Sequence, residues 1–203
     1  MMKIKNELSL LSKEISTSIR KFFGGTDYRR WRNLKNLHEA WDDRTHRIAA
    51  LIKPGASVIE FGAGRLVLKT LLPAACSYTP SDLVDRGAGT IVCNLNALAL
   101  PDFGRYDVAV FSGVLEYVAD VSRLIRHLSS SMDVIIASYA VTDKAKKNRR
   151  ANGWINDYSS DQFVAIFTAA GFACDHREEW GHQQIIYRFL NLRGVGAHNI
   201  GVP

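Results

Sequence analysis

The residues best suited to binding a ligand lie around a short apolar run at positions 57–61. Glu60 lies near the end of this run, and Gly62 and Gly64 come directly after it. Glycines let the backbone approach a ligand closely, and an acid at the tip of a strand holds hydroxyl or ammonium groups. The succession of strand, acid, glycine turn and helix therefore indicates a nucleotide-type site.

Two further polar residues fall where later strands are expected to end. Asp82 comes 22 positions after Glu60 (82 − 60), close to the ~20 typical of a carboxylate that binds ribose hydroxyls. Asn94 ends a third apolar segment and has both a donor and an acceptor for an adenine edge. Because parallel strands bring their carboxyl ends to one edge of a sheet, we expect these three side chains to lie together.

Four segments resemble, in order and spacing, those of the class I S-adenosylmethionine-dependent methyltransferases. They are VIEFGAG at 58–64, SD at 81–82, NLNALALPD at 94–102 and YDVAVFSGVLEYV at 106–118, within a resemblance that covers about residues 56–190. It implies S-adenosyl-L-methionine as the cofactor, with Asp82 on the ribose, Asn94 on the adenine amine, and Ser112 and Gly113 beneath the sulfonium. The cofactor-binding residues expected from it are Glu60, Gly62, Ala63, Gly64, Asp82, Leu83, Asn94, Leu95, Ser112 and Gly113.

A nicotinamide dinucleotide is the alternative cofactor, since it also uses a glycine turn and a downstream acid. Its fingerprint GxGxxG needs three glycines to seat a pyrophosphate on a helix N-terminus, whereas GAGRLV at 62–67 supplies two. The methyltransferase family often has a third glycine as well, at the position where this chain has Leu66. A carboxylate at Glu60 would repel phosphates and attract the ammonium group of a methionine. The sign of this interaction favours adenosylmethionine.

Candidate catalytic residues follow the fourth expected strand. Methyl transfer to a hydroxyl is helped by a base, and Glu116 and Tyr117 are the candidates, with Tyr117 standing where the family pattern often has histidine. Trp31, Trp154 and Tyr158 are expected to contact the substrate. No cluster of histidine, cysteine and carboxylate has metal-ligand spacing, so we expect no metal.

The elements that must position these residues alternate between strand and helix from residue 56 onward. This alternation predicts an α/β fold: a doubly wound, Rossmann-like, seven-stranded, mostly parallel sheet with an antiparallel last strand, preceded by N-terminal helices. The strands are expected at 57–61, 77–82, 90–94, 106–112, 133–139, 172–180 and 183–190. We expect an N-terminal helical segment at 1–53, a class I methyltransferase domain at 54–192 and a loose tail at 193–203.

The N-terminal segment begins with an amphipathic pattern. Apolar residues recur every three or four positions, which predicts a helix that ends at Gly24 and Gly25. Its apolar face is expected to pack on the domain's own core or on a sister subunit, as in a homodimer; a membrane-surface helix is the alternative. The residues of this face are Ile4, Leu8, Leu11, Ile15, Ile19 and Phe22.

The charge and composition limit the partners. The 203 residues carry a net charge of +6, concentrated before residue 38, and a second basic run spans 144–150. Such runs favour an anionic or sugar-linked metabolite and leave RNA methylation open. With no apolar run long enough to span a membrane, we expect a cytoplasmic enzyme that methylates a small-molecule hydroxyl; a non-catalytic module with this fold is the third possibility.

Overall fold

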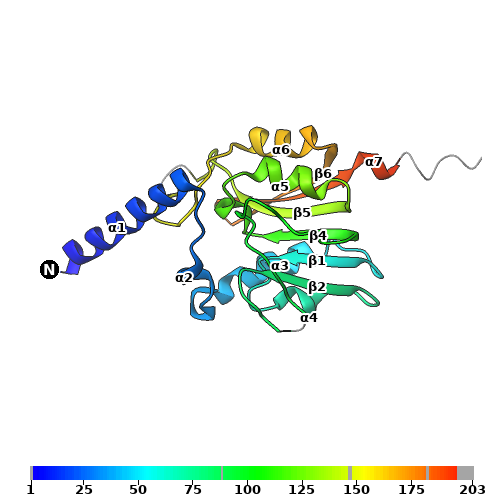
Figure 1. Ribbon diagram of the computed structural model, residues 1–203, viewed down its shortest axis with the longest axis horizontal. Helices are drawn as coiled ribbons and strands as arrows, with labels where there is room; N and C mark the ends of the chain where they lie inside the picture. The colour runs from blue at the N-terminus through cyan, green and yellow to red at the C-terminus, as the bar shows by residue number, and fades with distance from the viewer. Residues whose placement is uncertain (1, 88, 146–147, 182, 196–203) are drawn as a thin grey trace, which may run out of the picture.

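The computed structural model describes residues 2–87, 89–145, 148–181 and 183–195, which form a three-layered α/β domain with a helix extending from it (Figure 1). The seven strands lie in the order β3-β2-β1-β4-β5-β7-β6, and only β7 runs antiparallel to its neighbours. This confirms the predicted fold. The strands are β1 (Ser57–Phe61), β2 (Ser77–Asp82), β3 (Ile91–Val92), β4 (Tyr106–Ser112), β5 (Met132–Ala140), β6 (Phe172–Trp180) and β7 (Gln184–Asn191).

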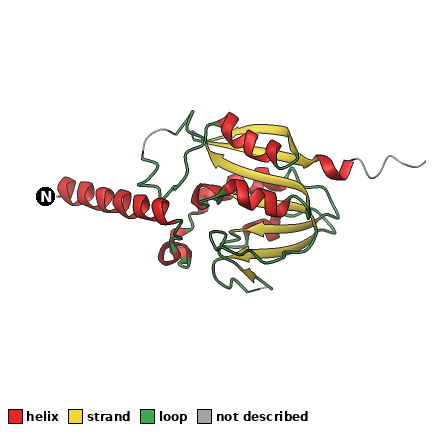
Figure 2. Cartoon of the chain, turned by 45° about the horizontal axis from the view of Figure 1, so that its top comes forward, coloured by secondary structure: helices red, strands yellow, loops and turns green. Residues whose placement is uncertain are grey.

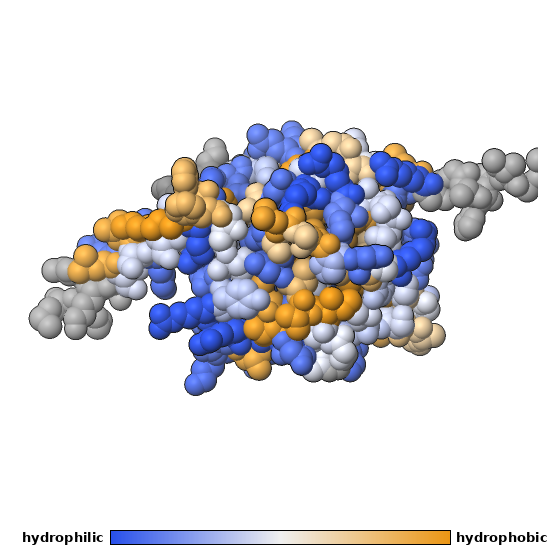
Figure 3. All heavy atoms as spheres, in the orientation of Figure 1, coloured by the Kyte–Doolittle hydropathy of each residue, from blue (hydrophilic) through white to orange (hydrophobic). Residues whose placement is uncertain are grey.

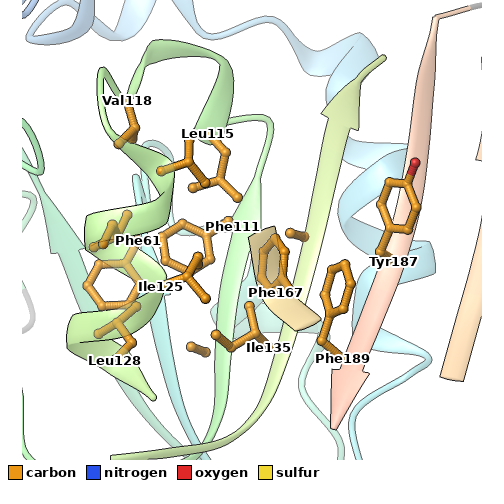
Figure 4. Close-up of a cluster of buried hydrophobic side chains, with 14 of the residues drawn as sticks. Phe61, Phe111, Leu115, Val118, Ile125, Leu128, Ile135, Phe167, Tyr187 and Phe189 are labelled. Carbon is orange, nitrogen blue, oxygen red and sulfur yellow. The ribbon is translucent and has the colours of Figure 1, made fainter. Parts of the chain in front are cut away.

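The central strands are buried because both sheet faces are covered by helices (Figure 2). On one face, α3 (Asp42–Ala49) and α4 (Val67–Leu71) pack on alternate residues such as Val58 and Val110. On the other, α5 (Val121–Leu128) and α6 (Ser160–Ala169) pack on the intervening residues. Figure 4 shows this second core, which is rich in aromatic rings; Phe167 and Phe189 stack with their centroids 3.8 Å apart. The period of two along each strand thus assigns every residue to one helical layer.

Capping residues fix where the helices begin. Asp120 accepts a hydrogen bond from Arg123 N at the start of α5, and Ser159 forms a capping box with Gln162 at the start of α6. At α3, Asp42 is the first helical residue, and Trp41 holds the cap position without a side-chain hydrogen bond.

Several segments are shorter or differently arranged than the sequence predicts. The third strand has only two residues, and in the expected helical segment at 1–53 the helix α2 (Tyr28–Trp31) is a single turn. The chain continues as two single turns, η1 (Leu34–Asn36) and η2 (Glu39–Trp41). Each turn is preceded by a residue in an extended conformation, Asn33 before η1 and His38 before η2, so the turns do not join into one helix. A further turn, η3 (Leu115–Tyr117), follows β4. A short helix, α7 (Leu192–Val195), lies where the loose tail was expected to begin. Residues 196–203 of that tail lie outside the described residues.

The first helix, α1 (Met2–Phe23), projects away from the domain (Figure 1). Its apolar residues from Leu8 to Phe22 are exposed, and Figure 3 shows hydrophobic side chains along its surface. The expectation that this stripe packs on the domain's own core is therefore wrong, because the chain leaves the domain at Gly24, where φ is +63°. Packing against a sister subunit stays a prediction. Within the described residues, no helix combines the length and apolarity needed to cross a membrane.

Candidate functional site

A cavity of about 500 Å³ opens at the carboxyl ends of β1, β2 and β4. The N-terminal segment contributes residues from Arg20 to Thr45 to its wall, and the β6–β7 turn contributes Trp180 and Gln184. All ten predicted cofactor-binding residues line this cavity: Glu60, Gly62, Ala63, Gly64, Asp82, Leu83, Asn94, Leu95, Ser112 and Gly113. The structure therefore brings together residues that are separated by up to 53 positions (113 − 60) in the chain.

Glu60 lies at the end of β1 and is buried, with 4% of its surface exposed. Its Oε2 accepts a hydrogen bond of 2.5 Å from the Tyr78 hydroxyl. Burial raises the pKa of Glu60 to about 8, because the carboxylate loses its hydration and the nearby Asp82 charge opposes ionisation. A cation placed beside Glu60 would reverse this shift, so the site favours a positively charged ligand group.

The glycine turn after Glu60 lines the cavity with backbone. Gly62 has φ +71°, and a Cβ there would lie 2.5 Å from Val114 Cγ2. Gly62 N and Ala63 N both donate to Ser81 O, at 2.7 and 3.1 Å, while Gly64 N donates to Asp82 at 2.8 Å. The backbone N–H groups of the turn are thus used within the protein, and the missing side chains let Val114 and Leu37 pack directly against the turn beside the cavity.

Asp82 lies at the end of β2 and joins three parts of the site. Its carboxylate accepts the N–H groups of Gly64 and Leu83, and Arg86 Nε lies 3.2 Å from its Oδ2. Arg86 also donates to Trp31 O, at 2.5 Å. The acid that is suited to ribose hydroxyls is therefore coupled through Arg86 to the N-terminal segment.

Asn94, after β3, is held by the same N-terminal segment. Its Oδ1 accepts hydrogen bonds from the Thr26 hydroxyl at 2.8 Å and from Asn96 N at 3.0 Å. Asn96 Nδ2 in turn donates to Thr26 Oγ1 and to Tyr117 O. This network fixes the loop that would border an adenine ring.

At the end of β4, a guanidinium lies over the backbone. Arg44, from α3, donates to Ser112 Oγ and Ser112 O, each at 3.1 Å, and to Gln184 Oε1 at 2.7 Å. Gly113 has φ +70°, and a Cβ at this position would lie 2.5 Å from Arg44 Nη1. Gln184 Nε2 donates onward to Glu116 Oε1 at 3.0 Å. A buried chain of hydrogen bonds thus runs from Arg44 and Gln184, on the cavity wall, to Glu116 behind it.

The sequence model of a family described as a methyltransferase domain matches residues 28–177 of this chain. The chain belongs to this methyltransferase family. The matched range includes every cavity residue from Trp31 onward except Trp180, Gly181, Gln183 and Gln184, and it leaves α1 outside.

Solved structures share the fold of this methyltransferase at low sequence identity. A protein assigned as an O-methyltransferase from Nostoc punctiforme has a TM-score of 0.66 at 14% identity, over 88% of this chain and 68% of its own. Magnesium protoporphyrin IX methyltransferase from Synechocystis, solved with bound adenosylmethionine, has a TM-score of 0.56 at 17% identity, over 88% and 97%. The cyclase SpnF has a TM-score of 0.54 at 17% identity, over 68% and 58%. No curated protein matches the sequence.

The two catalytic candidates of the methyltransferase differ in placement. Tyr117 lines the cavity, and burial raises its pKa to about 12. Glu116 is fully buried and does not line the cavity; its Oε1 accepts Ala140 N at 2.9 Å as well as the Gln184 amide. Desolvation raises the pKa of Glu116 too. Glu116 therefore does not face the cavity, and the raised pKa of Tyr117 disfavours the phenolate that a base would need.

The three substrate-binding candidates also divide. Trp31 and Trp154 line the cavity, and Trp31 packs edge-to-face on Tyr117 with their centroids 4.7 Å apart. Tyr158 does not line it; its backbone N–H donates to the buried Tyr139 hydroxyl.

The described basic residues of the run at 144–150 form salt bridges within the protein. Arg149 and Arg150 both pair with Asp157, and Lys144 pairs with Glu179 at 2.7 Å. Lys146 and Lys147 lie outside the described residues. The expectation that this run forms a cationic surface for an anionic substrate is wrong for the two arginines, because Asp157 follows them closely enough in sequence to bind both.

Several cavity residues could not be predicted from the sequence. Arg44 and Gln184 lie 140 positions apart, and no local pattern marks either of them. Arg86 pairs with Asp82 four residues before it, but the residues between them are not helical, so the spacing alone does not indicate the pair. Trp41 and His38 also line the cavity.

Proposed function

We propose that this chain is an S-adenosyl-L-methionine-dependent methyltransferase that methylates an oxygen of a small-molecule acceptor. The observation that carries the proposal is the meeting of Glu60, Asp82 and Ser112 at one cavity on the carboxyl edge of the sheet. A buried acid beside a glycine turn suits an ammonium group and opposes a pyrophosphate, which separates adenosylmethionine from a nicotinamide dinucleotide.

The residues present fit this cofactor. Glu60 would hold the methionine ammonium, and the backbone of Gly62 and Gly64 would lie beside the methionine chain. Asp82 would bind the ribose hydroxyls, sharing its oxygens with Gly64 and Leu83, and Asn94 with Leu95 would border the adenine. Ser112 and Gly113 would lie beneath the sulfonium, at the end of β4.

Adenosylmethionine, when bound, would supply an electrophilic methyl group on a sulfonium, whose positive charge is lost when the methyl group leaves the sulfur in an in-line displacement. The protein's part is to align the acceptor with this group and to exclude water. We assign the second task to the N-terminal segment. It is tied across the cavity by Lys21 to Asp157 at 2.7 Å, by Arg30 to Asn152 O at 2.8 Å and by Asp43 to Trp180 at 2.7 Å.

Alignment, and not proton abstraction by Glu116 or Tyr117, is the proposed basis of catalysis. The raised pKa of Tyr117, about 12, keeps its hydroxyl neutral near pH 7, so its ring acts as a wall against Trp31. Glu116 acts through Gln184, whose amide it holds in place for Arg44. It is therefore a positioning residue.

Calorimetric titration with adenosylhomocysteine tests the cofactor assignment. The wild type should bind it, and Asp82→Ala should weaken binding about tenfold or more because hydrogen bonds to a charged group are lost. Asp161→Ala is the matched control, since Asp161 is an exposed acid of α6 that is not among the residues lining the cavity. Absence of binding to the wild type would overturn the proposal.

A second function, cofactor binding without methyl transfer, is favoured by one comparison. The cyclase SpnF shares the fold, so the fold alone does not require methylation. Incubation with methyl-labelled adenosylmethionine and a panel of hydroxylated small molecules separates the two. Transfer of label supports the methyltransferase, whereas binding without transfer to any acceptor favours the second function.

A further inference from the structure

An apolar stripe on α1 is left uncovered by the rest of the described chain. It consists of five side chains on one face of the helix, spaced three or four residues apart, and between 53% and 83% of each is exposed. Figure 3 shows hydrophobic side chains along α1 where it extends from the domain. A contiguous exposed stripe of this kind indicates an interaction surface. Its residues are Leu8, Leu11, Ile15, Ile19 and Phe22.

The segment that carries the stripe is strongly basic. Residues 1–37 contain nine lysines and arginines and three acids, a net charge of +6. The remaining residues contain 17 of each (26 − 9 and 20 − 3), so the whole net charge of the protein lies in this segment. Four of its cations are exposed and, over the described residues, have no carboxylate within 4.0 Å: Lys13, Arg29, Arg32 and Lys35.

This charge distinguishes between the two partners that an apolar helix face can take, a second copy of the chain and a membrane surface. A second copy would bring one segment of net charge +6 against another, and like charges repel. The helix itself has five cations and only two acids, Glu7 and Glu14, with which to offset that repulsion. An anionic bilayer attracts the cations and takes up the apolar stripe at the same time. The charge therefore favours the membrane.

We propose that α1 binds the surface of an anionic membrane, with its apolar stripe at the boundary between the headgroups and the acyl chains. This inference goes beyond the proposed function, which concerns the cavity alone. At 1.5 Å per residue, the 22 residues of α1 form a helix about 33 Å long, which can lie flat on the surface while the domain stays in water. Phe22 and the neighbouring Phe23, which are 83% and 76% exposed, add two aromatic rings at the domain end of the stripe.

Flotation with lipid vesicles tests the inference. We expect the wild type to bind vesicles made of equal parts of phosphatidylcholine and phosphatidylglycerol at least about tenfold more tightly than vesicles of phosphatidylcholine alone, because several cations approach the anionic surface. Raising the salt concentration from about 0.1 M to about 1 M shortens the screening length from about 10 Å to about 3 Å. It should therefore reduce the preference for the anionic vesicles.

Two variants place the same added charge on different sides of α1. Ile15 lies in the stripe, whereas Ser9 is exposed about 120° around the helix from it. Ile15→Glu should lower the affinity for the anionic vesicles about 10- to 100-fold, because the acyl boundary must take up a charge in place of an apolar side chain. Ser9→Glu is the matched control and should lose about fivefold at most, from its charge alone. Neither residue lines the cavity, and both variants should keep the thermal midpoint of the wild type.

The inference would be overturned if the wild type bound neither kind of vesicle, if it bound both equally, or if the two variants lost the same affinity. Sedimentation of the lipid-free protein tests the second copy. We expect no dimer that depends on the stripe. A dimer that Ile15→Glu dissociates and Ser9→Glu preserves would assign the stripe to a second copy of the chain and would also overturn the inference.

Discussion

Protonation of Glu60 should control cofactor affinity. Its pKa of about 8 means that the buried carboxyl is mostly neutral at pH 6 to 7. An ammonium group is attracted only to the ionised form, so binding must expel the proton and lower this pKa. The ligand-free protein binds more protons at Glu60 than the complex does, and affinity therefore rises with pH. If the pKa in the complex falls below 6, the rise is about tenfold between pH 6 and pH 7.

Calorimetry with adenosylhomocysteine in buffers of different ionisation enthalpy measures this effect directly. We expect release of about one proton per ligand near pH 6.5, together with the rise in affinity. Glu60→Gln resembles the neutral acid, so its affinity should be lower and nearly independent of pH. Methylthioadenosine, which has no ammonium group, provides the ligand control and should release no proton.

The reasoning would be refuted by pH-independent affinity without proton release in the wild type. The pH dependence of stability provides a separate test that the pKa of Glu60 is raised in the folded protein. A carboxyl whose folded pKa lies above its unfolded value stabilises the ligand-free protein at low pH, and this contribution is lost as pH rises from about 4.5 to about 8. The thermal midpoint of the wild type should therefore fall relative to that of Glu60→Gln as pH rises through this range.

Three stability predictions follow from the backbone and the charges. Gly62→Ala should lower the free energy of unfolding in urea by about 2–4 kcal/mol, because φ is left-handed and the new Cβ would overlap Val114 Cγ2. Gly55 has φ +78° and open space around it, so Gly55→Ala should lower this free energy by only about 1–2 kcal/mol. Equal losses would contradict the overlap. Leu66 has φ +59°, so Leu66→Gly should be about 1 kcal/mol more stable than Leu66→Ala, which keeps the strain; the reverse order would show that the strain is absent. The cations around Asp157 lower its pKa to about 2, so the stability lost in Asp157→Asn should be full above pH 4 and shrink as pH falls toward 2; a loss independent of pH would exclude the charge as its cause.

The sheet and the cofactor edge could be predicted because their signals are local. The run at 57–61 is apolar and ends in an acid and glycines, so strand, burial and turn follow from neighbouring residues. Asp82 and Asn94 were placed at the same edge by parallel topology alone, and both line the cavity. The position of β7 between β5 and β6 was not predicted, because strand order depends on pairings between distant residues.

The rest of the site depends on contacts that no local pattern records. Arg44 and Gln184 meet across 140 positions, and each looks like an ordinary polar residue in the sequence. Glu116 was expected at the substrate because it follows β4, but the turn at η3 directs its carboxyl to the Ala140 backbone, away from the cavity. Leu66 occupies the left-handed conformation that glycine would favour, so the missing third glycine changed the strain and not the turn.

The reversed direction of β7 has a consequence for how related enzymes diverge. Because β7 runs antiparallel to β5 and β6, the turn that joins β6 to β7 lies at the edge of the sheet where the cavity opens. Trp180, Gly181 and Gln183 line the cavity from this turn. A hairpin tip can gain or lose residues without disturbing the strand register behind it. Changes in the length of this one turn can therefore reshape one wall of the cavity while the residues at the ends of β1, β2 and β4 keep their places.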